Sequence, residues 1–390
     1  MSISPSIGAP LPHGWKRTQL RRLVDIRNGR DYKAVEVAEG GYPVYGSGGE
    51  FRRASDFLHD GESILFGRKG TVDRPLYVDG KFWTVDTMYY AVPLGQICVR
   101  FLYYFSTTIP FSYYVTSTAV PSVTQSDLAG HPVNLPPLDE QRAIADYLDR
   151  ETQKIDELIA EQRDLIETLW GRRKSVVSNT IDATTNSVKL KYILSRDRPL
   201  TYGIVQAGPP VDEGVPYIGP SDIVNHQVVG LRELRKTSPM IETSYKRSRV
   251  QQDDVVVSIG PAYGKTTMIP VELAGANLTQ DTARVSCDAA KALPRYVQWV
   301  LMSDSAHEFW NSRIMGATFR RLNLDVLAQT PIPLPSIGEQ CDIAAYLDEQ
   351  TSRIDVLISE SEDLIALSEE RRSALIIAAV TGQIDVRNAS

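Results

Sequence analysis

The segment from Gly260 to Thr266 has the residues most suggestive of nucleotide binding, because two glycines are followed by a Lys-Thr pair. Three residues separate the glycines, whereas a phosphate-binding loop needs four so that its backbone amides can surround the phosphates. Pro270 also stands where the following helix would have to continue. The glycines within Tyr45–Gly49 lack the strand-to-helix setting of a dinucleotide-binding loop. Both segments are therefore predicted to be ordinary turns.

Two aspartates, Asp86 and Asp281, are the candidate catalytic carboxylates, since each precedes an apolar stretch in its half of the chain. Neither has an evident acid or base partner nearby, so a turn or capping role is favoured. The five histidines and three cysteines show no HExxH, CxxC or other metal-ligand spacing. We therefore predict a non-catalytic chain that holds no metal or cofactor. The scattered cysteines also favour a reducing compartment, which indicates the cytoplasm.

Positive side chains occur in pairs beside predicted turns, with polar and aromatic residues close by in the sequence. Paired cations can contact phosphates, and Arg, Lys and Asn can also bond to base edges in the major groove. For any single pair, a solvated surface cluster is the alternative. The residues predicted to bind DNA are Tyr32, Lys33, Arg52, Arg53, Arg68, Lys69, Thr71, Tyr202, Lys246, Arg247, Arg249, Tyr263, Lys265, Thr266, Arg320, Arg321 and Asn323.

The distribution of charge supports this interpretation, although the net charge of the 390 residues is −6. Residues 11–134 and 183–333 are mildly basic, at +2 and +3, whereas 135–182 and 334–390 carry −4 and −7. The acidity therefore lies in two stretches that alternate with two basic ones. The longest apolar run, about eight residues, is far too short to span a membrane.

The two acidic stretches are copies of one another. Residues 135–182 align without a gap with residues 334–381, a shift of 199 positions, and 20 of the 48 pairs are identical. The shared pattern begins with Leu-Pro, continues through Glu-Gln, and is followed by Ile-Ala-x-Tyr-Leu-Asp. An internal repeat of this length is the main organising feature of the chain.

Each copy is predicted to form one long helix of roughly forty residues, about 60 Å long at a rise of 1.5 Å per residue. Ser336 and Glu339 form a capping box for the second copy; Pro137 prevents one in the first, where Asp139 is the suggested cap. The two helices are expected to pack antiparallel as a coiled coil with a globular unit at each end, the alternative being interior helices of a bundle. The predicted seam of the first copy is Ile144, Leu148, Ile155, Leu158, Ile159, Leu165, Ile166, Leu169 and Val176.

The two basic stretches share an order of elements but little sequence identity. Each has a buried strand entering a glycine turn, at Ile64–Phe66 and Val255–Ile259, then a helical pattern, at Phe101–Phe105 and Tyr296–Val300. Each closes with a polar loop and an apolar strand. We predict a mixed α/β (α+β) fold with a pseudo-twofold internal repeat. The predicted parts are 1–13 (tail), 14–134 (first globular domain), 135–182 (helix), 183–333 (second globular domain), 334–381 (helix) and 382–390 (tail).

The doubled Leu-Pro, Glu-Gln and Ile-Ala-x-Tyr-Leu-Asp pattern, each followed by a long helix, resembles the specificity subunits of type I restriction–modification systems, over almost the whole chain from Gly14. The resemblance implies two target recognition domains, each contacting one half of a bipartite double-stranded DNA site. It further implies that the helices set the gap and dock two methyltransferase subunits, which a helicase-nuclease subunit can join. AdoMet and ATP would belong to those partners. Thr201–Ile204 also resembles a segment common in these domains; the first half has no obvious equivalent.

Two hypotheses from other classes remain open at this point. One is a structural adaptor, in which the coiled coil assembles proteins and the globular domains bind peptides. The other is an enzyme with an unrecognised site at Asp86 or Asp281, which would make the purified chain active by itself.

Overall fold

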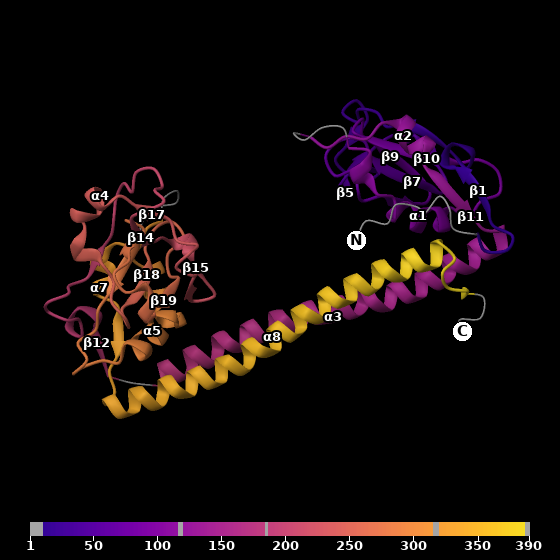
Figure 1. Cartoon of the computed structure of the whole chain (residues 1–390). Coiled ribbons are helices and arrows are strands. Elements are labelled where there is room, and N and C mark those ends of the chain that lie inside the picture. The colour runs from indigo at the N-terminus through magenta and orange to yellow at the C-terminus, as the bar shows by residue number, and fades with distance from the viewer. Residues whose placement is uncertain (1–10, 116–119, 184–185, 315–319, 387–390) are drawn as a thin grey trace. The chain divides into compact units, whose positions relative to one another are not determined.

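The computed structural model describes residues 11–115, 120–183, 186–314 and 320–386. They divide into two compact units: the first unit contains residues up to Gln162 together with those from Glu362 onward, and the second unit is Arg163–Ser361. Two long helices, α3 (Leu138–Asp182) and α8 (Ile337–Val380), contribute to both units (Figure 1). In the described part of the chain, no helix has the length and apolar character needed to cross a membrane.

The first unit is built on two sheets. The four-stranded sheet has the order β2-β10-β7-β8 and is antiparallel throughout. The five-stranded sheet has the order β3-β5-β4-β9-β6, and β4 and β9 pair in parallel. The strands are β2 (Val24–Asn28), β3 (Glu36–Val37), β4 (Tyr42–Gly46), β5 (Gly49–Ala54), β6 (His59–Asp60), β7 (Ser63–Gly67), β8 (Leu76–Val78), β9 (Lys81–Thr84) and β10 (Met88–Pro93).

Helices and a two-stranded ladder complete the first unit. The ladder joins β1 (Lys16–Gln19) to β11 (Pro132–Leu135). The main core packs α1 against the four-stranded sheet and against α3 and the end of α8, through Phe101, Ile144, Leu148 and Ile376. The helices are α1 (Val99–Thr107) and α2 (Gln125–Gly130), with short 3-10 turns η1 (Leu20–Arg22) and η2 (Phe111–Tyr113).

The second unit repeats this plan. Its four-stranded antiparallel sheet has the order β13-β21-β18-β19, and a three-stranded sheet has the order β17-β14-β20, with β14 and β20 parallel. A ladder of β12 and β22 corresponds to β1 and β11, and β15 pairs with β16 as a hairpin. The strands are β12 (Ser187–Lys189), β13 (Thr201–Tyr202), β14 (Val215–Ile218), β15 (Ile223–Val224), β16 (Gln227–Val228), β17 (Lys236–Thr237), β18 (Val255–Ser258), β19 (Thr266–Met268), β20 (Asn277–Leu278), β21 (Thr282–Val285) and β22 (Pro331–Pro333).

The helices of the second unit cover the same side of its core. Helix α5 packs Tyr296, Val297 and Val300 against β18 and β21 and against the long helices. The helices are α4 (Pro239–Thr243), α5 (Pro294–Met302), α6 (Asp304–Asn311) and α7 (Leu324–Ala328), with 3-10 turns η3 (Leu190–Tyr192), η4 (Pro220–Asp222), η5 (Lys246–Ser248) and η6 (Val271–Leu273). The shared order of elements predicted for the two halves is therefore confirmed, despite their low identity.

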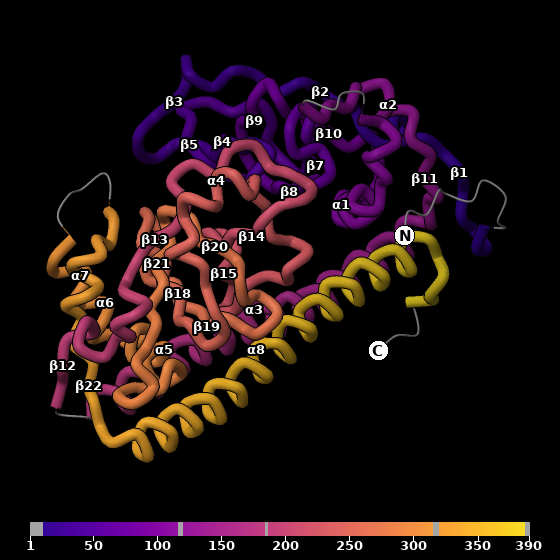
Figure 2. Tube along the Cα trace, turned by 60° about the vertical axis from the view of Figure 1, so that its left-hand side comes forward, coloured from indigo at the N-terminus to yellow at the C-terminus, as the bar shows by residue number. Residues whose placement is uncertain are grey.

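The long helices run antiparallel within each unit. In the second unit Leu169 packs with Ile354 and Ile358, whereas Ile181, further along α3, shares a core with Leu347, earlier in α8. The first unit shows the same reversal at its own ends of the helices, and Figure 2 traces both. The buried positions of α8 advance by steps of three and four, as a heptad seam requires: Leu347, Thr351, Ile354, Ile358, Ser361 and Ser368.

The ends and the seam of the long helices agree only in part with the predictions. The capping box is confirmed, since Ser336 N donates to Glu339 Oε2 (2.9 Å) and Glu339 N donates to Ser336 Oγ (3.4 Å). Asp139 does not cap α3; its side chain is fully exposed, 3.8 Å from Arg142. Leu165, predicted in the seam, is 42% exposed, because its position on the helix lies just outside the buried stripe.

The last described residues are not a detached tail as predicted. Val386 is buried in the core of the first unit with Trp15, and a Cβ added to Gly382 would lie 2.5 Å from Pro12. This close approach, together with a φ of +72°, explains why glycine follows the end of α8. The chain after α8 therefore turns back onto the segment that precedes β1.

A buried histidine makes the first unit sensitive to acid. His131 lies beside Phe105 and its Nδ1 is 2.7 Å from Tyr114 Oη. Burial lowers the pKa of His131 to about 4. The unfolded chain binds this proton near pH 6.5, so this unit should lose stability as the pH falls from about 6.5 to 4. Histidine NMR should show a neutral ring down to about pH 4, and His131→Gln should remove this part of the pH dependence of unfolding. A ring that titrates near pH 6.5 would contradict the prediction.

Candidate nucleic-acid interface

A buried glutamine at the start of each long helix fixes each globular domain on that helix. Gln141 Oε1 accepts from Cys98 N (3.0 Å), the residue that precedes α1, and its Nε2 donates to Pro136 O (2.8 Å). Gln340 Oε1 accepts from Leu293 N (2.8 Å), the residue that precedes α5, and its Nε2 donates to Pro335 O (3.0 Å). The Gln of the repeated Glu-Gln pair is therefore a structural clamp.

An aspartate about two turns later forms a second clamp. Asp149 Oδ1 accepts from Tyr104 Oη of α1 (2.6 Å), and the same carboxylate is paired with Arg100. At the equivalent position, Asp348 Oδ1 accepts from Trp299 Nε1 (2.8 Å) and from Arg295 Nε (2.8 Å) of α5. Within each unit these contacts fix the orientation of the domain relative to its long helix.

The two copies of the repeat also exchange ion pairs. In the second unit Arg173 Nε donates to Asp355 Oδ1 (2.8 Å), and in the first unit Arg372 Nε donates to Asp156 Oδ1 (2.8 Å). Because Arg173 and Arg372 are the same repeat position, as are Asp156 and Asp355, each copy supplies the arginine for the aspartate of the other. Such reciprocal contacts are the pattern of a twofold-related pair.

In the first unit, one group of predicted DNA-binding residues lies on the exposed strand β5. Arg52 is 3.2 Å from Glu36 and Arg53 is 3.1 Å from Glu50, so both are surface ion pairs that a phosphate could displace at little cost. Tyr32 packs edge-on against Phe51 at 5.3 Å between ring centres. A cleft of about 1020 Å³ lies here, lined by Lys33, Glu36, Val37, Ala38, Glu50, Phe51, Arg52 and Arg53.

The other predicted residues of the first unit follow strand β7. Lys69 and Thr71 are exposed, and Arg68 donates to the main-chain oxygen of Asp86 (3.4 Å) and lies 5.9 Å from the Tyr89 ring centre. Asp86 is a turn residue between β9 and β10, which fits its predicted turn role. The polar loop predicted at 116–124 lies partly outside the described residues.

In the second unit, Lys246, Arg247 and Arg249 line one side of a cleft of about 720 Å³. Arg198 and Arg284, which the sequence did not single out, line the same cleft. Isolated in sequence, these two arginines gave no pair signal. Arg198 lies on a loop 51 residues before Arg249, and Arg284 lies on strand β21, 35 residues after it.

Other predicted residues of the second unit are exposed but already bonded. Tyr263 Oη donates to Asn311 Oδ1 (2.5 Å), and Lys265 Nζ donates to Pro220 O (3.1 Å). Arg321 Nη2 is 2.8 Å from Asp281, a turn residue between β20 and β21. Arg320 and Asn323 are exposed, and the rest of their predicted loop, residues 315–319, lies outside the described residues.

Two of the predicted contacts need correction. Thr266 is fully buried in strand β19, because its side chain faces the interior of the sheet, so it cannot touch DNA directly. Arg249 is committed to the buried carboxylate of Glu242 through two hydrogen bonds, of 2.5 and 2.6 Å, and therefore has a structural role. The loop from Gly260 leads into strand β19 and no helix, as expected of an ordinary turn; Tyr45–Gly49 is likewise the β4–β5 hairpin turn.

The strand pairing reveals an equivalence that the sequence did not show. Tyr202 pairs with Ala283 on β21 and is followed by Gly203, where an added Cβ would lie 1.9 Å from Leu278 O. Asn28 holds the same place against β10 and is followed by Gly29, where an added Cβ would lie 2.0 Å from Val85 O. Asn28 is therefore the counterpart of Tyr202, and both side chains are exposed. A glycine in a close backbone approach is the signal that could have found it.

The fold and the site together define a class: a duplicated protein whose two sheet-and-helix domains, each clamped to a copy of one long helix, present exposed cationic loops. The family model described as the type I restriction modification DNA specificity domain matches residues 12–168 and 210–363. The chain belongs to this family. The match includes both copies of the domain, which accords with the repeated fold.

Relatives and solved structures agree with this assignment. The chain is 26% identical over 295 residues to the type I restriction enzyme EcoBI specificity subunit of Escherichia coli, an alignment that covers 69% of this chain and 62% of that subunit. The fold is similar to a chain in a structure of the type I R-M system (TM-score 0.72, 15% identity, 96% of this chain and 100% of the other). It is also similar to the HsdS subunit from Thermoanaerobacter tengcongensis (TM-score 0.52, 15% identity, 98% and 100%).

Proposed function

We propose that this chain is the DNA-reading subunit of a type I restriction–modification complex, in which each globular domain contacts one half of a bipartite double-stranded target. The observation that carries the proposal is the duplicated domain on a duplicated helix within a family of DNA specificity domains. Two similar folds with different exposed loops suit the reading of two different half-sites. The long helices would set the gap between them.

The surfaces of the long helices support docking of two methyltransferase subunits. Leu165 in the second unit and Leu364 in the first are the same repeat position, and both are exposed. Exposed large apolar side chains on a surface typically mark sites of protein interaction. Further ones in the second unit are Trp170, Tyr346, Val356 and Leu357, and in the first unit Leu367. One equivalent surface in each unit suits two copies of one partner, to which a helicase-nuclease subunit could be added.

The chain itself is proposed to be non-catalytic, with AdoMet and ATP bound by its partners. Within the described residues, no group of three His, Cys, Asp or Glu side chains is placed to hold a metal ion. We assign the chain to the cytoplasm, where its DNA and its partners would be found. An adaptor with peptide-binding domains is the competing class, and it predicts no dependence of DNA modification on this chain.

Single-molecule sequencing of modified bases tests the proposal in a host that carries the complex. The expected result is one modified motif made of two short specific parts separated by a fixed number of unspecified bases. The motif should disappear when this chain is deleted. A modified motif that is continuous, or modification that persists without this chain, would contradict the proposal.

Separate reading by the two domains is tested with Arg320→Ala combined with Arg321→Ala. Both side chains are exposed in the second unit, and removing one phosphate contact should lower the slope of log affinity against log salt by about 0.9. We expect binding by the assembled complex to weaken, and discrimination against DNA altered in one half-site to decrease. Discrimination at the other half-site should be unchanged. Arg313→Ala, another exposed arginine of this unit, is the control. Equal impairment at both half-sites would argue against two independent domains.

A further inference from the structure

The cationic cleft of the second unit has the construction of an anion-binding site. Five positive side chains line it, against one exposed carboxylate, that of Asp197; the five are Arg198, Lys246, Arg247, Arg249 and Arg284. Two further carboxylates, Asp254 and Glu242, are buried behind it. Including these, the cleft has a net charge of about +2.

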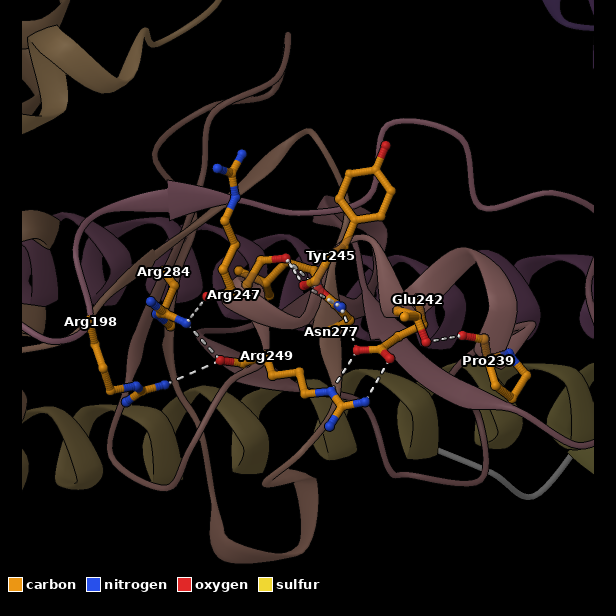
Figure 3. Close-up of polar contacts among 11 residues, drawn as sticks. Arg198, Pro239, Glu242, Tyr245, Arg247, Arg249, Asn277 and Arg284 are labelled. Atoms are coloured by element: carbon orange, nitrogen blue, oxygen red, sulfur yellow. Dashed lines mark hydrogen bonds and ion pairs between the residues drawn. The ribbon is translucent and has the colours of Figure 1, made fainter.

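The cations of this cleft form two layers. In the inner layer, Arg198 is paired with Asp254 (2.6 Å) and Arg249 with Glu242 (2.5 Å), so each of these arginines is matched by a buried carboxylate. The bond from Arg249 lowers the pKa of Glu242, which keeps that carboxyl charged at neutral pH. Figure 3 shows the Arg249 guanidinium directed at Glu242. The inner layer is therefore structural.

The inner layer also fixes the loop that carries the outer layer. Arg284 Nη1 donates to the main-chain oxygens of Arg247 (2.5 Å) and Arg249 (2.8 Å), and Arg198 Nη2 donates to the latter as well (3.2 Å). Asn277 Nδ2 donates to Tyr245 O (3.0 Å) and its Oδ1 accepts from Ser248 Oγ (2.7 Å). The loop from 245 to 249 is thus held by buried bonds on both sides.

Arg284 is the least compensated charge in the cleft. It is only 3% exposed, its bonds go to neutral carbonyl oxygens, and its Nε has no hydrogen-bond partner among the described residues. Burial lowers its pKa, which reflects the cost of removing a positive charge from water. An anion in the cleft would reduce that cost.

The outer layer is available to a ligand. Lys246 and Arg247 are exposed on the short turn η5, and within the described part of the chain neither side chain has an ion pair or hydrogen bond. Figure 3 shows Arg247 pointing away from the buried network. Two free cations on a rigid backbone, in front of a poorly compensated buried arginine, suit an anionic oxygen group.

We propose that this cleft binds a phosphodiester group of the DNA backbone, with Lys246 and Arg247 as the direct contacts. Arg284 acts from behind them by its charge and by holding the loop, while Arg249 and Glu242 are positioning residues. The site gives the second domain affinity and register and carries no base preference, since phosphate contacts position a protein without reading sequence. The assignment rests on the proposed function as a DNA reader.

The test is DNA binding by the assembled complex as a function of salt, comparing the wild type with Lys246→Ala combined with Arg247→Ala. We expect the variant to bind about tenfold more weakly and the salt slope to decrease by about 2, equally for cognate and altered DNA. Lys291→Ala combined with Arg313→Ala removes the same charge from the same unit outside the cleft, and should have a smaller effect. A methylphosphonate placed at the contacted position should weaken the wild type and leave the cleft variant unaffected.

Each other outcome overturns the assignment in a distinct way. Unchanged affinity and slope in the cleft variant, with a wild type that binds normally, reject the cleft and leave the proposed function intact. Altered base preference at an unchanged slope would make the loop a base reader. If sodium phosphate, compared with sodium chloride at equal ionic strength, stabilises the wild type alone while DNA binding is unchanged, the cleft is a site for free phosphate. A wild-type complex that binds no DNA rejects the proposed function itself.

Discussion

Gln340→Ala is expected to lower the free energy of unfolding of the second unit by about 3 kcal/mol. Gln340 is fully buried, and its amide makes three hydrogen bonds, to Leu293 N, Pro335 O and Lys291 O. Alanine would leave these main-chain groups without partners in a partly buried place and would also open a cavity. Hydrogen exchange of the amides at the start of α5 should accelerate first, because the Leu293 amide loses its acceptor.

The adjacent residue provides a matched control. Glu339 belongs to the same repeated Glu-Gln pair but is exposed, and it bonds only within the capping box with Ser336. Glu339→Ala should therefore cost about 1 kcal/mol and leave α5 unaffected. Gln340→Met keeps most of the volume without the hydrogen bonds and should behave like Gln340→Ala. If methionine restores stability, packing and not hydrogen bonding explains the buried glutamine.

The same clamp should transmit a stability defect into function. Since Gln340 and Asp348 hold α5, and α5 supports strands β18 and β21, loosening the clamp should disturb the second domain more than the first. Discrimination at one half-site would decline before discrimination at the other. Gln141 is the corresponding position for the first domain.

The repeat in the sequence was sufficient to predict the long helices and their antiparallel packing, because identity at 199-residue spacing is kept where side chains make structural contacts. Gln141 and Gln340, and Asp149 and Asp348, are identical pairs of this kind. Their partners could not be predicted, since Gln141 and Gln340 bind main-chain amides, and the aspartates meet a tyrosine in one unit and a tryptophan in the other.

The candidate site was predicted less completely, because exposure depends on tertiary packing. Thr266 follows a lysine beside a glycine turn, which is a plausible loop pattern, yet its strand turns the side chain into the core. Arg249 has no partner in its local sequence, and the buried Glu242 opposite it is visible only in the fold. Arg198 and Arg284 are distant in sequence from the residues that they join in the cleft, so no local pattern could reveal them.

The equivalence of Asn28 and Tyr202 leads to the prediction with the largest expected effect on specificity. Each is an exposed residue at the end of the same strand of its domain, directly before a buried glycine that fixes its backbone. Asparagine can form a bidentate contact with adenine, and tyrosine offers a hydroxyl and a stacking surface. If the two positions read DNA, each should act on its own half-site.

Asn28→Ala is expected to weaken binding to the cognate site by about 5- to 100-fold, corresponding to roughly 1–3 kcal/mol for a base contact, and to relax the preference at one base of one half-site. Tyr202→Ala should relax the other half-site and leave the first unchanged. Binding of the assembled complex to DNA altered at each half-site in turn measures both effects. Tyr192→Ala, an exposed tyrosine of the second unit, and Asn134→Ala, on β11 of the first, are the controls. If Asn28→Ala and Tyr202→Ala impair the same half-site, the strand equivalence has no counterpart in recognition, and the two domains do not read DNA independently through this position.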